Sequence, residues 1–213
     1  MTKGLRRRGR LVAAVGAVVL LSGGGAWWWT NRVPVVQLPD RVCGGALSGT
    51  PVAAILPKKG GEYEGTFVQP AYDPAEQKPK SLCSMMAADR AISATYSWTT
   101  STLASSGYLE RRGTPLRLGE APGYTGPREA ALLLACYSPS DVRYPWLEVT
   151  VTRYRDLNSV RKKGQIEVDP QRDPVLMAEL AADAARYLAQ QLKCEVAPRL
   201  PAGPPVMGGG ASD

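Results

Sequence analysis

The chain has 213 residues, with 26 lysines and arginines, 19 aspartates and glutamates, four cysteines and no histidine. Without histidine, Ser-His-Asp and Cys-His catalysis are excluded, and the commonest side-chain ligand of catalytic zinc is missing. Six basic and no acidic residues lie in residues 1–32, so the remaining chain carries 20 basic against 19 acidic residues. Its length of about 180 residues predicts one domain. Because its net charge is close to zero, there is no electrostatic reason to expect nucleic acid binding.

A basic stub and a charge-free apolar segment open the sequence. Residues 1–10 contain five lysines and arginines, and Leu11–Trp29 contains no ionisable side chain. As a helix, Leu11–Trp29 would be about 28 Å long, close to the hydrocarbon thickness of a bilayer. A basic flank stays on the cytoplasmic side. We therefore expect a transmembrane signal-anchor at 11–29 that contacts the lipid bilayer and holds the remaining chain outside the cell membrane.

A cleaved secretory signal is the alternative. In that interpretation Leu11–Leu21 is the apolar region, and Gly24 and Ala26 are small residues at a peptidase site. We favour the retained anchor because Trp27–Trp29 directly after such a site would make an unusual mature N-terminus. The domain lies outside the cytoplasm under both interpretations.

The first part of the domain is expected to follow an extended stem at 30–40. Residues 41–56 are predicted to be helical in two pieces, the second beginning at Thr50-Pro51 and stopping before Pro57. A loop rich in glycine, proline and charge follows at 58–80, with a short strand expected at 66–68.

Alternating and apolar segments then predict an antiparallel sheet. Residues 81–86 and 91–98 form an expected hairpin, because apolar and polar residues alternate along its second strand. Residues 145–155 alternate in the same way. The apolar run 129–137 is predicted to be a central strand buried on both faces, with a helix as the competing interpretation. We expect a further strand at 115–118, a turn at 120–127 and a solvated connection at 158–172.

The end of the domain is predicted to be a long helix that opens at Asp173-Pro174. Along it Leu176, Leu180, Ala184, Leu188 and Leu192 recur every four residues, which forms one apolar face. The residues after Val196 are rich in proline and glycine and are expected to be disordered from 197 to 213.

All four cysteines, Cys43, Cys83, Cys136 and Cys194, follow the apolar segment, so two disulfides are expected. Three pairings are possible. We predict Cys43–Cys83 and Cys136–Cys194, because each pair would join a helix to the strand on which it packs. A zinc site is not expected, since there is no C-x-x-C motif.

The predicted fold class is therefore α+β: an antiparallel sheet of four or five strands, packed by a short N-terminal helix and a long C-terminal helix, over residues 41–196. The chain begins with a basic segment, a single expected span and a stem rich in valine and proline. These are followed by Leu-Pro-Asp-Arg-Val-Cys-Gly-Gly-Ala-Leu at 38–47, by Ala135-Cys136 and by a final Leu192-Lys193-Cys194. In this layout the chain resembles uncharacterised single-span, membrane-anchored extracellular proteins of actinobacteria. It is more distantly similar to actinobacterial lipoproteins of unknown function, although it lacks their lipobox cysteine.

No segment predicts catalysis, a cofactor or a metal. Ser159 and Lys162 match S-x-x-K, but they lie in a polar connection without an apolar pocket to lower the lysine pKa. Glu62/Glu64 and Asp169/Asp173 are acidic pairs that solvation or helix capping explains, and Asp169–Asp173 lacks a calcium-loop pattern. The aromatic residues Tyr96, Trp98, Tyr108 and Trp146 are either a ligand-facing patch or, as we favour, packed against the sheet.

The resulting hypothesis is a non-enzymatic envelope protein whose extracellular domain binds an envelope protein, another envelope component or a small apolar ligand. One alternative is a histidine-free serine hydrolase that uses Ser159 and Lys162. Another is an accessory subunit whose span packs against a second membrane protein through Ala14, Gly16 and Gly23–Gly25.

Overall fold

The computed structural model describes residues 38–56, 63–71, 78–87, 90–99, 106–136, 146–155, 172–194 and 199–208. The chain divides into two units, Met1–Val35 and Val36–Asp213, and every described residue lies in the second. The expected span Leu11–Trp29 and almost all of the expected connection 158–172 lie outside the described residues. Within the described residues, no helix is both long and apolar enough to cross a membrane.

One large antiparallel sheet forms the centre of the domain, so the α+β class is confirmed. Its strand order is β10-β6-β7-β8-β9-β5-β4-β3. The prediction of four or five strands is wrong, because the described residues form eight strands in this sheet. The strands are β3 (Glu64–Phe67), β4 (Lys80–Ala87), β5 (Arg90–Thr99), β6 (Thr114–Leu118), β7 (Ala121–Thr125), β8 (Glu129–Ala135), β9 (Trp146–Arg155) and β10 (Val206–Met207).

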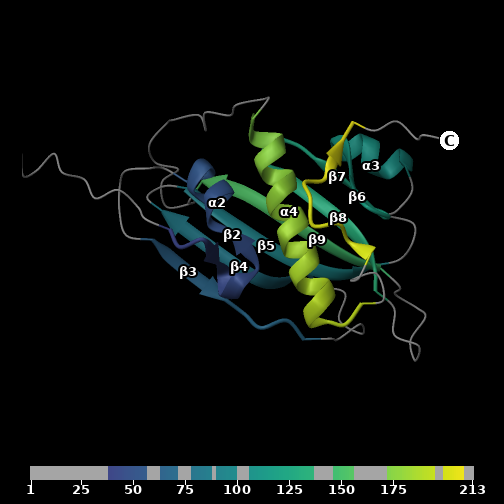
Figure 1. The fold of residues 1–213 in the computed structure, drawn as a ribbon. Helices are drawn as coiled ribbons and strands as arrows, with labels where there is room; N and C mark the ends of the chain where they lie inside the picture. The colour runs from purple at the N-terminus through teal and green to yellow at the C-terminus, as the bar shows by residue number, and fades with distance from the viewer. Residues whose placement is uncertain are drawn as a thin grey trace, which may run out of the picture. The chain divides into compact units, whose positions relative to one another are not determined.

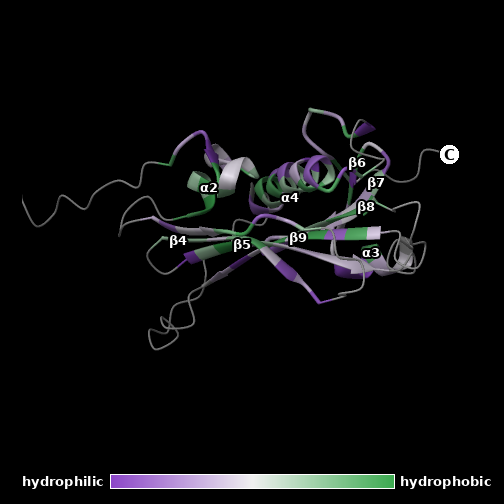
Figure 2. Cartoon of the chain, turned by 90° about the horizontal axis from the view of Figure 1, so that it is seen from below, coloured by the Kyte–Doolittle hydropathy of each residue, from purple (hydrophilic) through white to green (hydrophobic). Residues whose placement is uncertain are grey.

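Helices cover the two faces of this sheet unequally. The long helix α4 (Arg172–Gln191) crosses one face, and the short helix α2 (Gly49–Ile55) lies beside it on the same face (Figure 1). Helix α3 (Ser106–Arg112) lies on the opposite face, next to β6 and β7 (Figure 2). The main core therefore lies between the sheet and α4.

The apolar face predicted for the long helix is the face that packs on the sheet. Leu180, Ala184 and Leu188 are fully buried, and they join the same core as the inward side chains of β8 and β9. A helix whose apolar residues return every turn gains its stability from this burial rather than from its own hydrogen bonds.

The alternating strands pair as the sequence predicts. β4 and β5 form the expected hairpin, and β5 pairs with β9 from Arg90↔Arg155 to Thr99↔Trp146. The inward residues on both strands are buried, and the intervening serines, threonines and Glu148 are more exposed. The buried set is Ile92, Ala94, Tyr96, Trp98, Leu147, Val149 and Val151.

The apolar run 129–137 forms strand β8 and not a helix. Leu132 and Leu134 face the core under α4, whereas Ala131 and Leu133 join a smaller cluster on the α3 side. Because helices cover β8 on both faces, its sequence is apolar at successive positions rather than at alternate ones.

The turn predicted at 120–127 is wrong, because Ala121–Thr125 forms strand β7. Only Gly119 and Glu120 turn the chain between β6 and β7, and Gly119 has φ +60°, which glycine adopts without strain. Pairing of β7 with β8 begins at Gly123, one residue after Pro122. Proline has no amide hydrogen to donate, but position 122 lies outside the β7–β8 hydrogen-bond ladder, so Pro122 is tolerated.

The first helical piece predicted in residues 41–56 is also wrong. Strands β1 (Arg41–Val42) and β2 (Leu47–Ser48) pair around a 3₁₀ turn, η1 (Cys43–Gly45). Gly44 and Gly45 have φ of 63° and 92°, which an α-helix cannot contain. The second piece is confirmed as α2, which ends before Pro57.

Residues 199–208 differ from the prediction of a disordered tail. The two-residue strand β10 pairs with Leu116 and Arg117 of β6 at the edge of the sheet. The side chains of β10 are exposed, so the segment is held by backbone pairing at β10 and by the packing of Leu200 against the core. Proline and glycine content alone did not reveal that an open strand edge was available to it.

Candidate functional site: a cleft between α2, α4 and the C-terminal segment

Two disulfides join the layers of the domain, in the pairing that the sequence predicts. Cys43 of η1 is bonded to Cys83 of β4, and Cys136 after β8 is bonded to Cys194 after α4. All four sulfur-bearing side chains are buried, and no cysteine is free. The first bond fixes the segment before α2 to the sheet, and the second fixes the end of α4.

A cleft of about 430 Å³ lies on the outer side of α4. Its walls come from the start of α2, the middle of α4 and the C-terminal segment. This volume is within the range of small-molecule sites, about 300–1,000 Å³. The lining residues are Ser48, Thr50, Pro51, Glu179, Ala182, Asp183, Arg186, Ala202, Gly203, Pro204 and Pro205.

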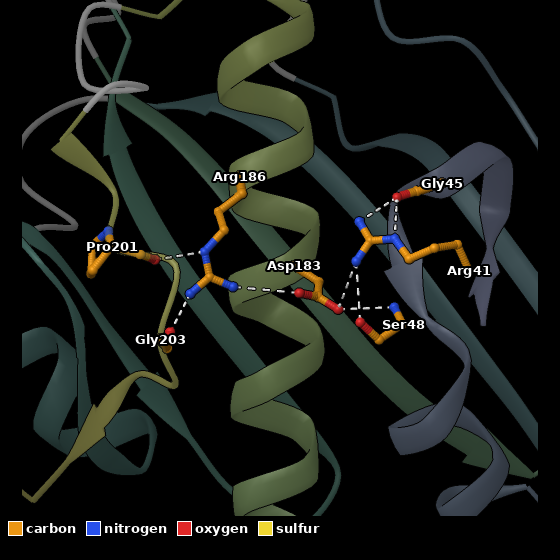
Figure 3. Close-up of polar contacts among 7 residues, drawn as sticks. All are labelled: Arg41, Gly45, Ser48, Asp183, Arg186, Pro201 and Gly203. Carbon is orange, nitrogen blue, oxygen red and sulfur yellow. Dashed lines mark hydrogen bonds and ion pairs between the residues drawn. The ribbon is translucent and has the colours of Figure 1, made fainter.

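Asp183 connects the helices on either side of the cleft (Figure 3). Its Oδ2 atom accepts a hydrogen bond of 2.8 Å from the backbone amide of Ser48, the residue before α2, and lies 3.7 Å from Nη1 of Arg41. Ser48 makes no side-chain cap of its own. The carboxylate of α4 thus satisfies an amide at the start of α2, where negative charge is favourable.

Arg186 of α4 binds the C-terminal segment, which forms one wall of the cleft. Its Nε donates a 2.8 Å hydrogen bond to the carbonyl of Pro201, its Nη2 donates to the carbonyl of Gly203, and its Nη1 lies 3.4 Å from Oδ1 of Asp183 (Figure 3). Burial lowers the pKa of Arg186, and Asp183 opposes that effect. The guanidinium is therefore occupied by acceptors from its own chain.

Glu179 also lines the cleft, one helical turn before Asp183. Among the described residues, no side chain or backbone amide forms a hydrogen bond or an ion pair with its carboxylate. The cleft is thus lined by one engaged arginine, one engaged aspartate and one glutamate whose carboxylate has no partner among the described residues, and a second engaged arginine, Arg41, lies beside Asp183.

A second polar cluster lies on the opposite face of the sheet, where α3 packs. Nη2 of Arg112 donates a 2.7 Å hydrogen bond to the hydroxyl of Tyr124, which in turn donates to Glu129. Burial raises the pKa of Tyr124, and its hydrogen bond to Glu129 adds to the increase. The guanidinium of Arg112 also lies 5.1 Å from the centre of the Tyr124 ring. These contacts fasten the last turn of α3 to β7 and β8.

Glu148 lies on this face of β9. Burial raises the pKa of its carboxyl group; the positive charge of Arg112 opposes the increase and Glu129 adds to it. A raised pKa is a known mark of functional carboxyl groups, and it is also common in structural ones. Here it accompanies the packing of Arg112, the last residue of α3, on this face.

Several residues considered from sequence lie outside the described part of the chain, namely Glu62, Ser159, Lys162 and Asp169. Asp173, at the start of α4, accepts a 2.6 Å hydrogen bond from Nη1 of Arg153 in β9, and Glu64 is exposed on β3. Within the described residues, no three Cys, Asp or Glu side chains gather in a group that could hold a metal ion.

The four aromatic residues do not form one patch. Tyr96 and Trp98 are buried in the core under α4, whereas Tyr108 and Trp146 pack on the cluster at the α3 face. The interpretation that they pack against the sheet is confirmed. Their separation follows from alternation, because β9 turns Trp146 to the face opposite the core.

Sequence reasoning missed the cleft residues Glu179, Asp183 and Arg186, and Arg41 beside them. One signal was present: Glu179, Asp183 and Arg186 recur at helical spacing on a helix that is otherwise largely apolar. That spacing indicates a polar stripe, but only the tertiary structure shows that α2 and the C-terminal segment enclose it.

No protein-family model, curated protein or solved structure matches this chain. Its function must therefore be argued from the cleft, the disulfides and the expected topology.

Proposed function

We propose that this protein is a non-enzymatic binding domain, held outside the cytoplasmic membrane by the segment Leu11–Trp29, and that the cleft receives its ligand. The observation that carries this proposal is the pair of buried disulfides, which use every cysteine of the chain. Structural disulfides persist in oxidising compartments and are rare in the cytosol. The resemblance to membrane-anchored actinobacterial proteins agrees with the same location.

The cleft supports binding better than catalysis. Asp183 and Arg186 are held by hydrogen bonds to each other, to Ser48 and to the C-terminal segment, so they are arranged as a scaffold. A nucleophile needs an adjacent base, and none of the described residues that line the cleft is a histidine or lysine that could serve the hydroxyls of Ser48 and Thr50. An envelope protein or a small envelope component is the proposed partner class.

Fractionation of the producing cells followed by non-reducing peptide mapping tests the location. We expect the protein in the membrane fraction, with Cys43 linked to Cys83, Cys136 linked to Cys194, and the N-terminal peptide retained. A reduced sample mapped in parallel is the control. Recovery from the cytosol with free thiols would refute the proposal.

Site-specific photocrosslinking tests the cleft. A photoreactive amino acid at Thr50, which is exposed and lines the cleft, should form an adduct in intact cells. The matched control places the same group at Glu110, which is exposed on α3 on the opposite face. Equal adducts at both positions would show that the cleft is not the binding surface.

A further inference from the structure

The charges of the cleft determine what kind of ligand it accepts. Both guanidinium groups beside it are already engaged: Arg41 donates to the carbonyl of Gly45 and to Ser48 Oγ, and Arg186 donates to the carbonyls of Pro201 and Gly203. Each also lies against Asp183. An anionic ligand would compete with these acceptors and would face the carboxylates of Asp183 and Glu179, so an anion is disfavoured.

A ligand can reach the carboxylate of Glu179 without competing with a partner from the described residues. Glu179 is partly buried at the cleft wall, and no described residue neutralises it. It lies on α4 seven residues before Arg186, which is about 10 Å along a helix at 1.5 Å per residue. A cation at Glu179 would therefore be well separated from the Arg186 guanidinium.

The remaining walls suit a methylene chain that ends in hydrogen-bond donors. Pro51, Pro204 and Pro205 present ring carbons and have no amide hydrogen, and Ala182 forms an apolar floor. Prolines offer only carbonyl acceptors, whereas an ammonium group offers three donors. A lysine side chain combines such a head with an apolar stem.

We propose that the cleft binds an alkyl ammonium group, as carried by a lysine side chain or by a free diamine, with Glu179 as its counter-ion. This inference rests on the proposed binding function and names the chemistry of the ligand.

Isothermal titration calorimetry of the full-length protein in detergent tests it with two cationic probes. Nα-acetyl-lysine methylamide represents a side chain in a peptide, and 1,5-diaminopentane represents a free diamine. Nα,Nε-diacetyl-lysine methylamide is the uncharged control. We expect saturable binding of at least one cationic probe and none of the diacetyl compound; tighter binding of the methylamide or of the diamine identifies the source.

The variant Glu179→Gln should weaken binding about tenfold, which corresponds to the loss of one partly enclosed ion pair. Glu110→Gln, a change of the same kind on the opposite face, should leave binding unchanged. The inference is overturned if no cationic probe binds, if the diacetyl compound binds equally well, or if Glu179→Gln binds like the wild type. In those cases membrane location, disulfide mapping and crosslinking at Thr50 would still decide the proposed function separately.

Discussion

The partly buried Glu148 and the buried pair Arg153–Asp173 show how the burial of charged groups affects this fold. Glu148 has a raised pKa, so between the ordinary value of 4.5 and its value in the folded protein, the folded state binds more protons than the unfolded state. Stability then falls as the pH rises through that window. Arg153 and Asp173, in contrast, are opposite charges that neutralise each other, with side chains 3% and 10% exposed.

Glu148→Gln should therefore change stability in a pH-dependent way. At pH 4 we expect the variant and the wild type to be about equally stable, because the carboxyl group is largely protonated in both states. At pH 7 the variant should be more stable, since no charge has to be buried. Thermal unfolding followed by circular dichroism at both pH values measures this, with Glu110→Gln as the control; a variant that is less stable at pH 7 would contradict the argument.

Asp173→Ala should lower the free energy of unfolding by about 3–5 kcal/mol, because it leaves the buried guanidinium of Arg153 without its carboxylate. The double variant Arg153→Met with Asp173→Ala should lose less than Asp173→Ala alone, since it also removes the guanidinium that has lost this carboxylate. Urea denaturation of the three proteins measures both effects. Equal losses in the single and double variants would mean that the ion pair is not the source of the cost.

At the scale of elements, the strands that the sequence predicts well are those whose side chains alternate or are continuously apolar. β5 and β9 alternate, β8 is covered on both faces, and all three form where expected. The sequence of β7 predicts a turn instead of a strand, because Pro122 and Gly123 are typical of turns. The reason for Gly123 is tertiary: a Cβ atom there would lie 2.0 Å from the carbonyl oxygen of Ala131 in β8.

Gly123→Ala should thus push β7 and β8 apart. We expect a loss of about 1–3 kcal/mol, the usual cost of inserting a methyl group into packed structure. Gly126→Ala is the matched control, because its Cβ atom would lie 3.7 Å from the nearest carbonyl oxygen, an ordinary contact. Urea denaturation compares the two, and similar stability of both variants would show that the strands can separate at little cost.

At the scale of the whole molecule, the two disulfides link segments that are 40 and 58 residues apart in sequence. One attaches η1 to the β3–β4 side of the sheet, and the other attaches the end of α4 to β8. Both segments border the elements that form the cleft, so the crosslinks hold its helical walls on one rigid support.

Replacing Cys43 and Cys83 by alanine, or Cys136 and Cys194, should cost about 2–4 kcal/mol per bond, because loops of this length strongly restrict the unfolded chain. The loops 43–83 and 136–194 do not overlap in sequence, so their effects on the unfolded chain should add. Urea denaturation of each double variant and of the fourfold variant measures this, and the wild type under reducing conditions should approach the fourfold variant. Unchanged stability after loss of both bonds would contradict a structural role.

The sequence by itself determined the α+β class, the main strands, the long helix and the cysteine pairing, because periodicity along a segment already fixes which of its faces is buried. It did not determine the full width of the sheet, the hairpin around η1 or the cleft. Those depend on contacts between distant segments: Gly123 against Ala131, β10 against the edge of β6, and Asp183 between Ser48 and Arg186. Only the tertiary structure brings such residues together, since nothing in the local pattern of either partner specifies the other.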